Sequence, residues 1–152
     1  MQFLRWILGK LIKKPFEMDD EFFGRLVSMR SYWEAKRRFA PTGTEIELFI
    51  DAPGHQQPPN QQQRDFFAWV ERDYGDIIKN VDRVARPVYE QWLRKAIDGP
   101  FETEFTLGSF SIPLPTDGPA QWQIYFDSRS DEEHILIVDL RGADALIAHM
   151  DG

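Results

Sequence analysis

Histidine and carboxylate side chains are the groups of this chain with the chemistry for acid–base catalysis or metal binding. His134 follows Glu133 and begins the most apolar run of the sequence, and Asp139 comes directly after that run. A histidine near carboxylates can move protons or can bind zinc or iron. We therefore name His134, Glu133 and Asp139 as candidates for a ligand or metal site.

The remaining metal-binding side chains argue against such a site. The chain has no cysteine, and no two of its three histidines are closely spaced. A zinc or iron centre would have to be assembled entirely by tertiary structure. Because a lone histidine at a strand end is usually structural or on the surface, we expect no metal and no cofactor.

Enzymatic signatures are equally sparse. Glu45 and Glu47 alternate along a strand-like stretch, which puts both carboxylates on one face, but such acids usually form the wet side of a strand. The sequence has no nucleophile elbow and no glycine-rich phosphate loop. We expect a protein without enzymatic activity. The alternative is an uncharacterised hydrolase or small-ligand-binding protein with a cleft between helix and sheet.

Charge is unevenly distributed along the 152 residues. The chain carries 18 Lys and Arg against 25 Asp and Glu, a formal net charge of −7. Residues 1–14 contain Arg5, Lys10, Lys13 and Lys14 and no acid, so 14 basic and 25 acidic residues, or −11, remain for the rest. Nucleic-acid binding requires a net basic face, so we expect no nucleic-acid partner.

The basic segment 1–14 has apolar residues on one helical side and polar or basic residues on the other, which predicts an amphipathic N-terminal helix. Its apolar stretch is too short and too charged to span a bilayer. Docking on its own domain or on a second copy, as a homodimer, is the favoured interpretation. Trp6 and the absence of acids leave peripheral membrane association as an alternative. No small-residue cleavage site follows, so we expect a cytoplasmic protein.

The sequence beyond the acidic link 17–21 predicts strands on both sides of one helical region. Alternation of apolar and polar residues is clearest over 44–51, where Phe49 lies on the polar side. A change in the apolar phase predicts a bulge at Gly108 and Ser109. The predicted strands cover residues 23–29, 32–39, 44–51, 101–115, 121–127, 134–138 and 143–150.

The helical region begins with a capping box, in which Asn60 accepts from an early N–H and Gln63 reaches back. An apolar stripe continues from there to Leu93. Pro87 interrupts the stripe, which predicts a kink or a division near Arg86, and residues 98–100 are expected to end the helix.

These elements predict an α+β fold. We expect a mostly antiparallel sheet of six to seven strands, with a kinked helix or helical hairpin packed on one face, because the strands are not separated by helices. The N-terminal amphipathic helix is additional. The predicted organisation is a segment over 1–14 and a single α+β domain over 20–152.

Several short patterns follow one another along the chain. They are Phe23-Gly24-Arg25-Leu26, Tyr32-Trp33-Glu34, Ile50-Asp51, Gln61 to Gln63, Trp122-Gln123-Ile124 and Glu133-His134-Ile135. In this order the chain resembles small bacterial α+β domains of unknown function, over residues 20–152. Some similar acidic domains are immunity or accessory partners of bacterial toxin systems, so the resemblance implies an interaction role.

A protein partner is therefore the expectation for this chain. An acidic domain rich in aromatic residues offers the side chains that dominate protein interfaces. The candidates for contact with the partner are Trp6, Trp33, Arg37, Phe49, Glu45 and Glu47.

Overall fold

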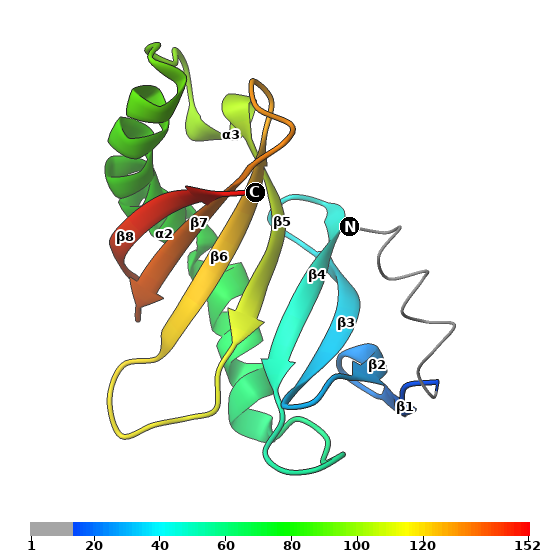
Figure 1. The fold of residues 1–152 in the computed structure, drawn as a ribbon. Coiled ribbons are helices and arrows are strands. Elements are labelled where there is room, and N and C mark those ends of the chain that lie inside the picture. The colour runs from blue at the N-terminus through cyan, green and yellow to red at the C-terminus, as the bar shows by residue number, and fades with distance from the viewer. Residues whose placement is uncertain (1–13) are drawn as a thin grey trace.

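The computed structural model describes residues 14–152 as one eight-stranded sheet with a long helix across one face (Figure 1). The expected α+β class is confirmed, and so is the position of the helical region on one face. The strands are β1 (Glu17–Asp20), β2 (Gly24–Ser28), β3 (Tyr32–Phe39), β4 (Thr44–Asp51), β5 (Phe105–Ile112), β6 (Gln121–Ser128), β7 (Ile135–Arg141) and β8 (Asp144–Asp151), and the helices are α2 (Gln61–Leu93) and the single turn α3 (Phe101–Glu104).

The order of the strands in the sheet follows their order in the chain. Every neighbouring pair is antiparallel except β4 and β5, which are parallel. Antiparallel neighbours are joined by short turns, whereas a parallel pair needs a long crossover, and α2 is that crossover. The helix therefore connects two four-stranded halves and covers one face of both.

The sequence predicted six to seven strands, and the sheet has eight. The strand that was not predicted is the short edge strand β1. Residues 17–21 were expected to be a link because four of the five are Asp or Glu. Pairing with β2 decides otherwise, since Arg25 of β2 binds Glu17 directly. Asp20 then closes the turn by accepting from the backbone N–H groups of Phe22 and Phe23.

The capping box at the start of α2 is confirmed. The Asn60 side chain accepts from the Gln63 backbone at 3.0 Å, and the Gln63 side chain accepts from the Asn60 backbone at 3.1 Å. Gln63 is also fully buried and donates to the Asp51 carbonyl at 2.7 Å, which ties the helix start to the end of β4.

The helical hairpin is wrong, because α2 is one helix of 33 residues that continues through Pro87. The proline lies on the exposed side, while Ala85 and Tyr89 on either side of it are fully buried. Arg86 spans the same turn by binding Asp82 at 2.7 Å. Packing and this ion pair offset the backbone hydrogen bond that Pro87 cannot make.

Both ends of the segment after α2 differ from expectation. The helix stops at Leu93, where Arg94 adopts a left-handed φ of 56°, rather than at residues 98–100. Residues 101–104 form a helical turn instead of the start of a strand, with Thr103 donating back to the Pro100 carbonyl. The bulge is confirmed, because the register of β5 against β6 shifts between Leu107 and Ser109.

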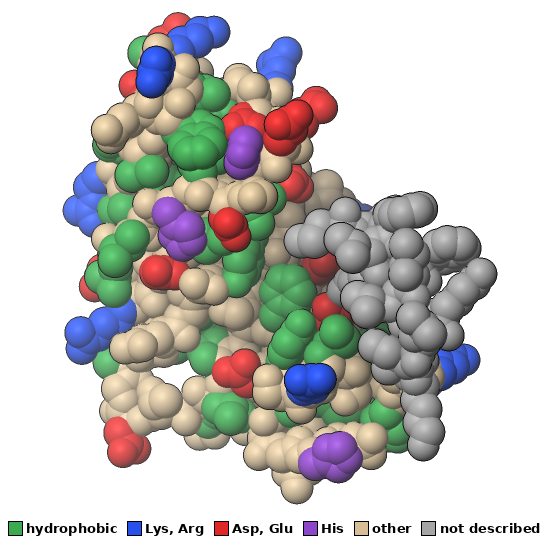
Figure 2. Space-filling model, in the orientation of Figure 1, with side chains coloured by type: hydrophobic (Ala, Val, Ile, Leu, Met, Phe, Trp, Pro, Cys, Tyr) green, Lys and Arg blue, Asp and Glu red, His purple; other side chains and the backbone are tan. Residues whose placement is uncertain are grey.

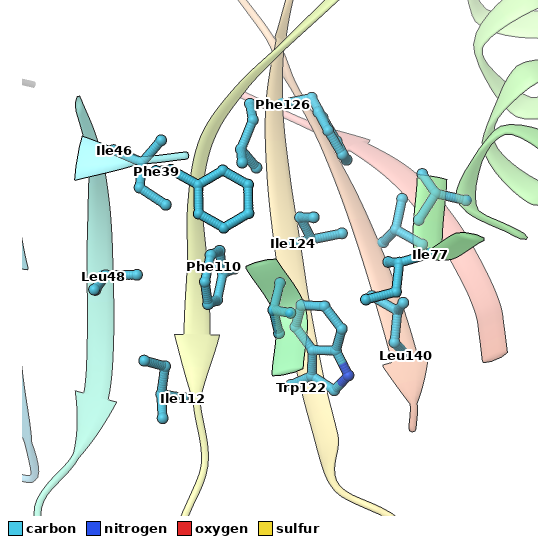
Figure 3. Packing of buried hydrophobic residues seen from close by; sticks show 14 of the residues in the cluster. Phe39, Ile46, Leu48, Ile77, Phe110, Ile112, Trp122, Ile124, Phe126 and Leu140 are labelled. Atoms are coloured by element: carbon cyan, nitrogen blue, oxygen red, sulfur yellow. The ribbon is translucent and has the colours of Figure 1, made fainter. Parts of the chain in front are cut away.

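The core lies between the sheet and α2. Alternate residues of the central strands point at the helix, as Figure 3 shows for Leu48, Phe110 and Trp122. Phe67 of α2 stacks on Phe110 with ring centroids 5.9 Å apart, and Phe39 meets both rings edge-on. This aromatic packing fixes α2 on one face of the sheet.

The membrane alternative depends on helices of the chain. No helix within residues 14–152 is long and apolar enough to cross a membrane. The predicted N-terminal helix and its docking lie outside the described residues.

Candidate interaction site

The sheet has a second face, opposite α2, that no helix among the described residues covers (Figure 1). We call it the open face. Figure 2 shows this face with acidic and hydrophobic side chains close together over the central strands. A hollow of about 870 Å³ lies there, over β4, β5 and β6. Its lining includes four acids and four aromatic residues, namely Glu45, Glu47, Asp51, Asp127, Tyr32, Phe49, Tyr125 and Phe126.

The alternation of β4 supplies the first side of the hollow. Ile46, Leu48 and Ile50 are buried against α2, so the residues between them must face the other way. Glu45 and Glu47 are exposed, and Phe49 is half-buried. The parallel pairing with β5 then places Ser109 beside Glu47 and Ser111 beside Phe49.

The floor of the hollow is an aromatic row supported by hydrogen bonds. Phe49 meets the rings of Tyr32 and Tyr125 edge-on, at centroid distances of 6.0 and 5.9 Å. The Tyr125 hydroxyl donates to Gln123 Oε1 at 2.6 Å, and Gln123 Nε2 donates to Asp139 at 2.6 Å. Burial, with a contribution from the nearby Asp139 carboxylate, raises the pKa of Tyr125, so the phenol stays neutral and keeps its donor.

The acids of the hollow have no positive partner in residues 14–152. None of the four forms an ion pair there, and no lysine or arginine belongs to the lining. Lys36 and Arg38 lie opposite Glu47 and Glu45 in the β3–β4 register, without closing to ion-pair distance. Within residues 14–152 the site therefore combines carboxylates that form no ion pair with aromatic surface, which suits a cationic and partly apolar ligand.

Three of the six predicted contact residues meet in this hollow. Glu45, Glu47 and Phe49 line it together. Trp33 is only 1% exposed on the helix side of β3, where its indole N–H donates to the Gln57 carbonyl at 2.8 Å. Trp6 lies outside the described residues.

Arg37 faces the helix side as well. Its guanidinium lies 4.2 Å from the ring centroid of Phe22 and 4.9 Å from that of Phe67, and it donates to the Phe22 carbonyl. The side chain therefore joins the β1–β2 turn to α2 and does not contribute to the open face.

The candidate ligand site around His134 is not assembled as proposed. His134 Nδ1 lies 2.9 Å from both carboxylate oxygens of Asp131, which also accepts from the Trp92 indole at 2.8 Å. These two hydrogen bonds hold the pKa of Asp131 below its usual range. Asp139 belongs to the hydrogen-bonded row with Gln123, and the Glu133 backbone bonds to Asp131. Within residues 14–152 no three His, Cys, Asp or Glu side chains converge to hold a metal ion.

Sequence reasoning missed several residues of the hollow, including Asp51, Ser109, Tyr125 and Asp127. The signal for Tyr125 and Asp127 was present, because both alternate with the buried Ile124 and Phe126 along β6. The sequence did not reveal that β5 alone separates β6 from β4 in the sheet, because this arrangement depends on the crossover through α2.

Searches of protein-family models, curated proteins and solved structures each found no match to this chain.

Proposed function

We propose that this chain is a non-enzymatic protein-interaction domain, of the immunity or accessory type, that binds a protein partner on the open face of its sheet. The observation that carries the proposal is the hollow over β4, β5 and β6, whose lining combines aromatic rings with four acids that form no ion pair within residues 14–152. The proposal places the domain in the cytoplasm, in keeping with a chain that has no cysteine.

The composition of the hollow favours a macromolecular partner over a small substrate. Aromatic residues at the centre of a patch, with charged residues around them, are typical of protein interfaces. Phe49 is half-buried among other rings, so its contact surface is already ordered and costs little side-chain entropy on binding. Glu45 and Glu47 are exposed beside it and would attract a basic surface and accelerate association.

The test compares partner capture by matched variants of the full chain in a lysate of the cells that encode it. Glu47→Lys reverses a charge inside the hollow, and Glu132→Lys makes the same change in the exposed turn before β7. We expect one protein to be recovered by the wild type and by Glu132→Lys and lost with Glu47→Lys. With that partner purified, Phe49→Ala should weaken binding at least about tenfold by calorimetry, as central aromatic residues usually do.

Two results would reject the function. In one, capture recovers nothing reproducible while metabolite screening finds a tight small ligand, which favours the hydrolase or ligand-binding alternative. In the other, a partner is recovered equally by the wild type and by Glu47→Lys, so the open face is not the binding site.

A further inference from the structure

The β5 bulge changes which side chains reach the open face. Leu107 pairs with Phe126, whose side chain is buried in the core, whereas Ser109 pairs with Tyr125 on the open face. Gly108 is the extra residue between them. Phe110 then returns to the core at 0% exposure. The bulge thus inserts a serine, in place of an apolar side chain, at the bottom of the hollow.

Ser109 is largely buried as a residue, while its hydroxyl oxygen is still reached from the hollow. The residue is 9% exposed and lines the hollow, and its side chain makes no hydrogen bond within residues 14–152. Ser111, the next serine on this face, differs because its oxygen accepts from the Gln123 backbone at 2.9 Å. Because no group within residues 14–152 bonds to it, the Ser109 hydroxyl is available to donate to or accept from a ligand in the hollow.

Two carboxylates lie beside this hydroxyl. Glu47 is the direct register partner of Ser109 on β4. Asp127 reaches the bulge from β6, because a Cβ on Gly108 would be 3.3 Å from Asp127 Oδ2. We call the group formed by Glu47, Gly108, Ser109, Tyr125 and Asp127 the bulge notch. It presents two carboxylates, a hydroxyl that has no partner within residues 14–152, and an aromatic ring. Lys36 of β3 lies opposite Glu47 on the side away from the notch, without forming an ion pair.

We infer that the bulge notch binds the guanidinium group of an arginine side chain on the partner protein. This inference rests on the proposed function and names the chemistry that the partner must present. A guanidinium carries five N–H donors in one plane and can serve two carboxylates and a hydroxyl together, and it packs well against aromatic rings. A lysine ammonium has three donors and no planar face, so it fits the same groups less completely.

The notch is tested directly with N-acetyl-arginine amide as the probe, titrated into the ¹⁵N-labelled full chain and followed by NMR. We expect amide shifts concentrated at Gly108, Ser109 and Tyr125, saturating in the millimolar range. N-acetyl-citrulline amide has nearly the same shape without the charge and should cause no shifts there. N-acetyl-lysine amide should bind at least about threefold more weakly, because it makes fewer hydrogen bonds.

Conservative substitutions separate the notch from the acidic surface in general. Asp127→Asn and Glu47→Gln should each weaken binding of the probe about tenfold, since each removes a charged acceptor. Ser109→Ala removes only the hydroxyl and should weaken it about threefold. Glu132→Gln is the matched control and should bind as the wild type does. If Asp127→Asn or Glu47→Gln loses the amide dispersion of a folded protein, the comparison relies on Ser109→Ala, the mildest change of the set.

Several outcomes would overturn the inference. They are equal binding of the citrulline or lysine probe, shifts spread over the acidic surface, or no effect of the notch substitutions. A further variant of the full chain has glutamine in place of Arg5, Lys10, Lys13 and Lys14. If the arginine probe binds to this variant and not to the wild type, the chain's own N-terminal segment occupies the notch.

Failure of the inference can be told apart from failure of the proposed function. If Glu47→Lys abolishes partner capture but Asp127→Asn and Ser109→Ala leave the affinity of the purified partner unchanged, the face binds a protein without using the notch. If the probe binds as expected but no protein partner is found, the notch stands and the proposed function fails.

Discussion

Replacement of Arg37 by alanine tests whether this side chain belongs to the interior or to a binding surface. Arg37 was a candidate for partner contact, yet its guanidinium lies over the rings of Phe22 and Phe67. Its neighbours in β3, Lys36 and Arg38, are exposed on the opposite face. The three residues carry the same charge on the same strand, so Lys36→Ala and Arg38→Ala are matched controls for the loss of one positive charge.

The expected loss of stability follows from the contacts of Arg37. Each ring contact contributes about 1 kcal/mol to the free energy of unfolding when partly desolvated. The hydrogen bond from the charged guanidinium to the Phe22 carbonyl contributes about 2 kcal/mol. Arg37 Nε is buried without a partner in residues 14–152, which offsets about 1 kcal/mol. We therefore expect Arg37→Ala to lower the free energy of unfolding by about 3 kcal/mol.

Urea unfolding of the full chain, followed by tryptophan fluorescence and circular dichroism, measures this difference. Lys36→Ala and Arg38→Ala should each stay within about 0.5 kcal/mol of the wild type. Arg37→Met should recover part of the loss, because a methionine side chain can keep apolar contact with the two rings.

The reasoning is refuted if Arg37→Ala is no more destabilising than Lys36→Ala. If the variant is also unable to bind a partner while retaining wild-type stability, Arg37 returns to the binding surface.

Three further predictions concern the helix and the turn before β7. Asn60→Ala removes the capping box and should lower the free energy of unfolding by about 1 kcal/mol in urea titrations, where no change would contradict the role of the cap. Pro87→Ala restores a backbone donor inside a continuous helix and should raise the stability by about 2 kcal/mol, the helical gain being partly offset by a more flexible unfolded chain; a lower Tm would count against it. Hydrogen bonds from His134 and Trp92 lower the folded pKa of Asp131, so its contribution is complete above the unfolded value near pH 4 and is lost as pH falls through the lower folded pKa. Asp131→Asn should therefore be less stable than wild type at pH 7, with the difference in urea midpoints shrinking as the pH falls below the unfolded value, and a difference independent of pH would contradict this account.

Features that depend on neighbours in the chain were predictable from the sequence. The capping box needs only Asn60 and Gln63, three residues apart, and it forms as expected. The strand over 44–51 was predicted with its correct bounds because alternation at period two is itself the cause of its two faces. The bulge at Gly108 was predicted for the same reason, since a phase change in the apolar pattern forces an extra residue.

Features that depend on competing interactions were not predictable. β1 has no apolar pattern of its own and forms because β2 lies beside it. The sequence left open whether the helix continues through Pro87 or divides there, and the packing of Ala85 and Tyr89 on either side of the proline decides for one helix. Arg37 was expected on the surface because of its type, but the rings of Phe22 and Phe67 reach it only in the folded chain.

The candidate site shows the same division. By itself, the sequence determined that Glu45, Glu47 and Phe49 share one strand face, and that the chain after residue 14 carries a net charge of −11. Only the tertiary structure decided that Ser109, Tyr125 and Asp127 join that face. Their positions depend on the parallel pairing of β4 with β5 across the 33-residue helix between them, and such a register is set by packing over the whole sheet and not by any local pattern.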